Sequence, residues 1–104
     1  MINRIWHGWT MRANADAYEN FLHEQILPGM HRVRGFQGAQ VLRRDVTDKD
    51  EVEFIVITRF DSIEAVKEFA GEDYEAAVVE PVARKLLVRF DARSAHYDVA
   101  FTIE

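Results

Sequence analysis

The stretch 51–60, EVEFIVITRF, constrains the fold more than any other part of the sequence. Its centre, from Phe54 to Thr58, consists only of aromatic and β-branched residues, without polar alternation. Successive side chains of a strand point to opposite faces of a sheet, so this run is typical of a central strand buried on both faces. A chain of 104 residues has enough helix to cover one face of such a sheet and too little to cover both. We therefore predict that a second copy of the chain covers the other face.

The composition fits one soluble domain, which we expect to span residues 1–104. Acidic residues outnumber basic ones by 18 to 13, so a nucleic-acid surface, which needs a basic excess, is not expected. The absence of cysteine excludes disulfides, thiolate nucleophiles and Cys-ligated metal centres. We find no signal-peptide pattern and no apolar run near the roughly 20 residues of a membrane helix. We therefore expect a cytoplasmic protein without a membrane partner.

The first third of the chain predicts a strand and then a helix. A strand over 2–11 carries one tryptophan on each face, so both faces are expected to be at least half buried. Gly8 indicates a bulge or the close approach of another group. Asn14 is a suitable N-cap for a helix that we expect to kink or end at Pro28-Gly29. Its apolar stripe recurs at spacings of three and four: Tyr18, Phe21, Leu22, Ile26 and Met30.

A hairpin and a second helix follow. The segments 36–46 and 51–60 predict two antiparallel strands joined by a polar loop. We expect Asp61 to cap the next helix, with Glu64 completing a capping box, and Gly71 to end it.

The C-terminal part predicts further helical turns and a last strand. We expect one or two turns over 74–80, a helical piece from Pro81 to Phe90, and a half-buried strand over 96–103. The order βαββαβ predicts an α+β, ferredoxin-like fold with a four-stranded antiparallel sheet and helices on one face.

Short segments spread over nearly the whole chain carry a family resemblance: Trp6-His7-Gly8, Gly35-Phe36, Val41 to Arg44, Phe60 to Ala65, Phe69 to Tyr74, Pro81, Phe90-Asp91 and His96 to Val99. Together they resemble the antibiotic biosynthesis monooxygenase family. Members of that family are dimeric α+β barrels, in which two sheets face each other and the helices lie outside. The resemblance therefore implies a homodimer.

The resemblance also implies an activity. Some members oxidise aromatic phenols with O₂ without metal or flavin, so we expect a cofactor-independent monooxygenase, or a related enzyme, acting on a small hydrophobic or aromatic molecule. A non-catalytic ligand-binding or stress-response barrel dimer is the alternative. A haem-handling protein is disfavoured. The positions at which the haem-degrading branch has Asn, Trp and His fall near Ile5, at Phe69 and at Val79, so the Trp and the His are absent.

In such relatives the cavity lies between the sheet and its own helices. Asn3, His7 and Trp9 share one face of the first strand, and we predict that they form the catalytic group. His7 would act as the base that deprotonates the substrate, while Trp9 and Asn3 would orient it. The alternative is that His7 is a hydrogen-bonded structural residue and that the tryptophans pack in the core and dimer interface.

Tyr74, Phe69 and His96 are predicted to contact the substrate, although His96 could instead lie at the sheet edge or face the dimer partner. No metal site is expected. His23 and His31 are eight residues apart, which is not the His-x-x-x-His spacing of a helical metal pair.

Overall fold

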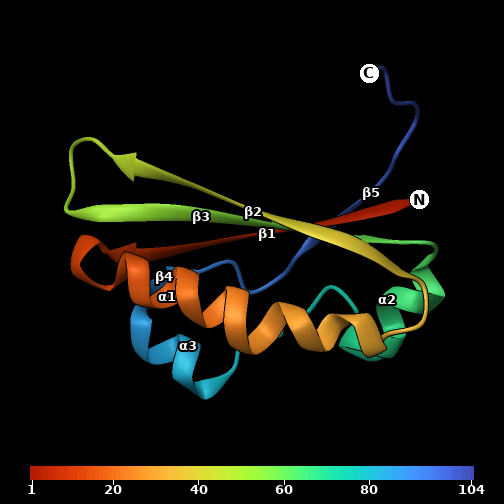
Figure 1. The fold of residues 1–104 in the computed structure, drawn as a ribbon, viewed down its shortest axis with the longest axis horizontal. Coiled ribbons are helices and arrows are strands. Elements are labelled where there is room, and N and C mark those ends of the chain that lie inside the picture. The colour runs from red at the N-terminus through yellow and green to blue at the C-terminus, as the bar shows by residue number, and fades with distance from the viewer.

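All helices of the chain lie on one face of an antiparallel sheet, and the opposite face carries no helix (Figure 1). The structure is a computed structural model that describes residues 1–104. Its elements are β1 (Ile2–Met11), η1 (Arg12–Asn14), α1 (Ala15–Phe21), η2 (Leu22–Ile26), η3 (Leu27–Arg32), β2 (Phe36–Val46), β3 (Glu51–Phe60), α2 (Ile63–Ala70), α3 (Pro81–Leu86), β4 (Leu87–Phe90) and β5 (Ala95–Asp98). The predicted α+β class, and the prediction that helices cover only one face, are confirmed.

The central strand is β3, which lies between β2 and β1 in the order β2-β3-β1-β4. Its pairing with β1 is unbroken over ten residue pairs, from Ile2↔Phe60 to Met11↔Glu51. The sheet has five strands where four were predicted, because the edge next to β1 is formed by two short strands instead of one. β4 pairs with one end of β1 and β5 with the other, and residues 91–94 interrupt them.

The long helical run from 12 to 32 changes its type along the sheet. It begins as the 3₁₀ turn η1, continues as α1, widens to the π-helix η2 and tightens again to the 3₁₀ helix η3. Pro28 lies at the start of η3, where its missing N–H is tolerated. The expected interruption at Pro28-Gly29 is therefore a change of helix type, and helical turns continue to Arg32.

The second helix begins one residue later than predicted. Ser62 is the N-cap, since its Oγ accepts a hydrogen bond from the Ala65 N–H at 3.2 Å. Asp61 was predicted to cap this helix, but its carboxylate accepts from Gln37 Nε2 at 2.7 Å instead. Gly71 ends the helix with φ of 90°, a backbone conformation that glycine adopts more readily than other residues.

Three predictions for the C-terminal third are wrong. No helix forms over 74–80, where Ala76 instead makes a β-bridge with Arg93. The helix from Pro81 ends at Leu86, because Leu87–Phe90 pairs with β1.

The last strand also ends earlier than predicted, at Asp98 rather than at residue 103. The Val99 N–H still donates to the Met1 carbonyl oxygen at 3.0 Å, but the strand pairing with β1 ends at the Ile2–Asp98 pair. The tail 99–104 exposes Phe101 (77%) and Ile103 (83%), and Figure 1 shows it leaving the sheet on the side away from the helices.

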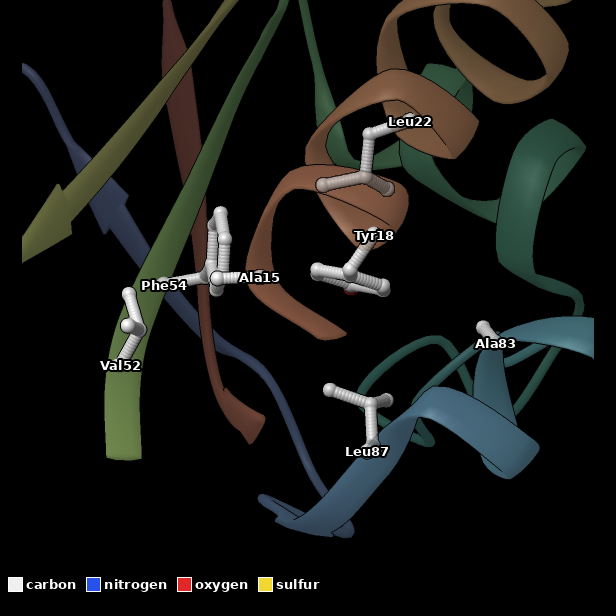
Figure 2. Close-up of a cluster of buried hydrophobic side chains, with 7 residues drawn as sticks. All are labelled: Ala15, Tyr18, Leu22, Val52, Phe54, Ala83 and Leu87. Carbon is white, nitrogen blue, oxygen red and sulfur yellow. The ribbon is translucent and has the colours of Figure 1, made fainter. Parts of the chain in front are cut away.

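Two apolar clusters hold the helices on the sheet. In the larger one, Tyr18 of α1 lies in the middle of a group contributed by α1, η2, β3, α3 and β4 (Figure 2). Its ring meets Phe54 edge to face at a centroid distance of 4.9 Å. The second cluster forms around Phe60, Val66 and Met30. None of the helices is long and apolar enough to cross a bilayer.

Candidate functional site

A cavity of about 290 Å³ lies between the sheet and the helical layer. Hydrophobic residues make up 12 of its 17 lining residues, and β1, β3, the 12–32 helical run and the segment 78–83 supply most of them. Its exposed lining residues, Gln25, Val78 and Glu80, form the mouth. The volume is near the lower end of the range for small-molecule sites, roughly 300–1,000 Å³.

Trp6 forms part of the cavity wall because β1 alternates. Residues with even numbers on β1 face the helices, and Trp6 is fixed there by a hydrogen bond from its Nε1–H to the Asp91 carbonyl oxygen at 2.8 Å. Gly8 leaves room for the indole, since a Cβ on Gly8 would lie 2.5 Å from the Trp6 ring. The close approach predicted at Gly8 is therefore confirmed.

Arg4 is the one charged residue of the cavity wall that is buried, with only 4% of its surface exposed. Its Nη1 donates to the Tyr74 carbonyl oxygen at 2.7 Å, and its Nη2 donates to the Ala76 carbonyl oxygen at 3.1 Å. The guanidinium also lies 5.4 Å from the centre of the Phe69 ring. Arg4 thus ties the irregular segment 74–76 to β1.

No carboxylate neutralises this guanidinium, because none of the ion pairs of the chain includes Arg4. Burial lowers the pKa of Arg4 to about 10. Arg4 therefore still carries its positive charge at neutral pH.

His96 stands beside Arg4, its pairing partner on β1. Its Nε2 lies 3.2 Å from Arg4 Nη1, and since a guanidinium only donates, Nε2 must be the acceptor. The proton of the neutral ring is then on Nδ1, which is buried without a partner. Burial, followed by the charge of Arg4, lowers the pKa of His96. The structure thus favours an uncharged His96.

Ser94 adds a polar group to the cavity. It is buried, and its Oγ has no hydrogen-bond partner. Its backbone N–H donates to the Glu75 carbonyl oxygen at 2.6 Å, between the two carbonyls that Arg4 binds. Arg4 and Ser94 therefore both bind the segment 74–76, and both line the cavity.

The predicted catalytic residues lie elsewhere. His7, Trp9 and Asn3 have odd numbers on β1, so they are on the helix-free face of the sheet, and none lines the cavity. The prediction of a shared face is confirmed, but the prediction that it faces the cavity is wrong. Because β1 has a tryptophan on each face, its sequence could not tell the two faces apart.

On the helix-free face His7 belongs to a charged cluster. His7 Nδ1 lies 3.0 Å from Glu53 Oε2, and the other carboxylate oxygen accepts from Arg44 Nε at 2.7 Å. The hydrogen bonds from His7, and then from Arg44, lower the pKa of Glu53. Trp9 stacks beside His7, and Arg89 lies 4.6 Å from the centre of its ring.

The predicted substrate contacts are closer to the cavity. Phe69 lines it, and Tyr74 and His96 meet each other and Arg4 at its polar end. Arg4 itself was missed. An arginine between Ile2 and Trp6 on one strand face was the available signal, but a half-exposed strand gives the same pattern.

Two positions of the haem-degrading branch can be located here. Phe69 and Val79, which the sequence predicts at the Trp and His positions of that branch, both line the cavity. Ile5 is on the helix-free face. The cavity wall carries no histidine.

No protein-family model and no curated protein matches the sequence. Solved structures do match it. A candidate antibiotic biosynthesis monooxygenase from Deinococcus radiodurans is 12% identical, with a TM-score of 0.68 and coverage of 100% of this chain and 97% of that one. Another from Bacillus cereus is 20% identical, with a TM-score of 0.62 and coverage of 99% and 95%.

The heme-degrader MhuD from Mycobacterium tuberculosis, solved with two hemes in its active site, is also similar. It is 18% identical, with a TM-score of 0.63 and full coverage of both chains. At these identities the similarity is one of fold. The chain therefore has the α+β fold shared by solved structures of candidate antibiotic biosynthesis monooxygenases and of a heme-degrading enzyme.

Proposed function

We propose that the chain is a monooxygenase, or a closely related enzyme, that acts on a small hydrophobic or aromatic molecule without a cofactor. The observation that carries this proposal is the apolar cavity between the sheet and the helices. Such a cavity excludes water from a flat apolar substrate and also admits O₂, which is itself apolar. The shared fold supports the same reading.

The chemistry requires an electron-rich substrate that loses a proton and then reacts with O₂. The substrate supplies the electrons: one oxygen atom ends in the product and the other leaves as water, as when a CH₂ group becomes a carbonyl. The protein has to bind the substrate, fix its orientation and stabilise the anion.

The role of the catalytic group predicted from the sequence is a separate proposal. His7, Trp9 and Asn3 are on the far side of the sheet from this cavity, so a base at His7 would need a different substrate position. Substituting His7 by alanine tests it, and undiminished turnover of a confirmed substrate would end that idea.

A ligand-binding protein without catalysis is the second candidate, since the same cavity would serve it. Haem handling is a third, suggested by the similarity to MhuD. Against it stand Phe69 and Val79, which the sequence predicts at the positions where the haem-degrading branch has Trp and His.

Screening phenolic and polycyclic aromatic compounds in an oxygen electrode separates the three. Oxygen uptake matched by oxidised product supports the enzyme. Quenching of tryptophan fluorescence without oxygen uptake supports the binding protein, because Trp6 lines the cavity. A Soret band on adding haem, with bleaching under reductant, supports haem handling.

We further propose that a second copy covers the helix-free face. Ile5, Ile55 and Ile57 are only half-buried there, and Leu42 and Tyr97 expose 46% and 56% of their surface. Leaving this apolar area in water is unfavourable. Sedimentation of the chain as a dimer at micromolar concentration is expected, and a monomer would contradict the proposal.

A further inference from the structure

We infer that the cavity binds its ligand as an anion, with a carboxylate or phenolate oxygen of an otherwise apolar molecule directed at Arg4. This inference deepens the proposed function and rests on it in one respect, that the cavity is the ligand site. It names the chemical class of the ligand and the residue that selects it.

The first support is the uncompensated charge of Arg4. Burying a charge is costly unless an opposite charge or hydrogen bonds compensate it. Arg4 is 4% exposed, but all of its partners are neutral: the carbonyls of Tyr74 and Ala76 and the ring of His96. The acidic residue of the cavity wall, Glu80, is exposed at the mouth and makes no ion pair.

The second support is spare hydrogen-bonding capacity. A guanidinium carries five N–H donors, and three hydrogen bonds are made by Arg4. The Ser94 hydroxyl, buried in the same wall, has no partner. Arg4 therefore has N–H donors free for an incoming oxyanion, and Ser94 adds an unpaired hydroxyl to the same wall. Hydrogen bonds between ions of opposite charge are the strong ones.

His96 acts as a positioning residue. Because Nε2 accepts from Arg4, the neutral ring holds the guanidinium without cancelling its charge. A carboxylate in this place would have formed an internal ion pair and left nothing for a ligand. The apolar remainder of the cavity then selects the rest of the molecule.

Three naphthalenes test the inference: 2-naphthoate, which is an anion, 2-naphthamide, its neutral counterpart of similar shape, and 2-naphthol. Titration calorimetry on the wild-type protein at pH 7 is expected to show naphthoate binding at least tenfold more tightly than naphthamide. In Arg4→Gln the two compounds should bind with about equal affinity. Lys85→Gln, which removes an exposed positive charge on α3, should retain the preference for naphthoate.

If Arg4→Gln does not fold, 2-naphthol decides on the wild-type protein. A buried cation should make the bound naphthol ionise at a lower pH than free naphthol, which its absorbance reports. Unchanged ionisation, or equal binding of naphthoate and naphthamide, overturns the anion inference alone. If no naphthalene binds, the cavity is not a ligand site, and the proposed function fails as well.

Discussion

His7 and Glu53 meet across β1 and β3 on the helix-free face, where His7 Nδ1 lies 3.0 Å from Glu53 Oε2. They are diagonal neighbours in the ladder, since Glu53 is paired with Trp9. Arg44 binds the second carboxylate oxygen, so the buried Glu53 has a cation or a hydrogen-bond donor on both sides.

Glu53→Gln should therefore destabilise the chain. The amide has one acceptor oxygen where the carboxylate has two, and its NH₂ group faces a donor. We expect a loss of about 1–3 kcal/mol in the free energy of unfolding, measured by urea denaturation at pH 7. Asp45→Asn, at the exposed Asp45–Arg12 pair, is the control and should change it by less than about 1 kcal/mol. Equal effects of the two substitutions would contradict this role of Glu53.

The same carboxylate predicts an acid dependence. The pKa of Glu53 in the folded chain is lowered from its ordinary value of 4.5. The stabilisation of the folded state by this carboxylate is therefore complete above pH 4.5 and is lost as the pH falls through the lowered pKa. Urea midpoints between pH 7 and pH 3 should fall more steeply for the wild type than for Glu53→Gln. Parallel curves would show that Glu53 has no such role.

His96 predicts a second dependence, at higher pH. Its folded pKa is lowered from 6.5, so the unfolded chain binds more protons just below pH 6.5. The contribution of His96 is therefore complete above pH 6.5 and is lost as the pH falls through the lowered value. His96→Gln should remove this part of the pH profile of stability, whereas His23→Gln, at an exposed residue of η2, should preserve it.

Gly8→Ala should disturb the cavity wall from within the sheet. A Cβ there would lie 2.5 Å from the Trp6 ring and 3.1 Å from Leu87, so the indole has to move against its hydrogen bond to Asp91. We expect a loss of about 1–3 kcal/mol and an altered tryptophan emission spectrum. Gly29→Ala has no atom within 4 Å of the new Cβ and should be nearly neutral, within about 1 kcal/mol. A Gly8→Ala protein of unchanged stability would refute the crowding.

Val79→Phe tests the cavity by filling it. Val79 is half-buried in the cavity wall, and the larger ring should occupy space that a ligand needs. Binding of any ligand found in the screen should weaken at least tenfold, with a stability change of less than about 2 kcal/mol. Val88→Phe, at an exposed position of β4, adds the same ring away from the cavity and should leave affinity unchanged. Undiminished binding to Val79→Phe would place the ligand elsewhere.

The sheet and its helix-free face could be predicted because they depend on the composition of one strand and on the length of the whole chain. The run from Phe54 to Thr58 has to be buried on two faces, and the count of remaining residues allows helices on only one. The hairpin 36–60 was predicted with its observed bounds because a polar loop separates two apolar runs.

The site could not be predicted in the same way. Whether odd or even residues of β1 face the helices depends on its register with β3, and both sets contain a tryptophan. Nor does the segment Pro81–Phe90 reveal that it changes from helix to strand at Leu87. Its apolar residues are compatible with a helix or a strand, and the pairing of Leu87–Phe90 with β1 decides for the strand.

The split edge next to β1 gives the two edges of the sheet different resistance to opening. β2, which forms one edge, pairs with β3 over ten residue pairs, whereas the other edge consists of two separate four-residue strands, β4 and β5, that pair with β1. Short edge strands detach at a smaller free-energy cost than one long edge strand. Ser94, which lines the cavity, and His96, which contacts Arg4, belong to this weaker edge. Brief detachment of this edge would expose the Arg4 end of the cavity to water while the β2–β3 hairpin stays paired.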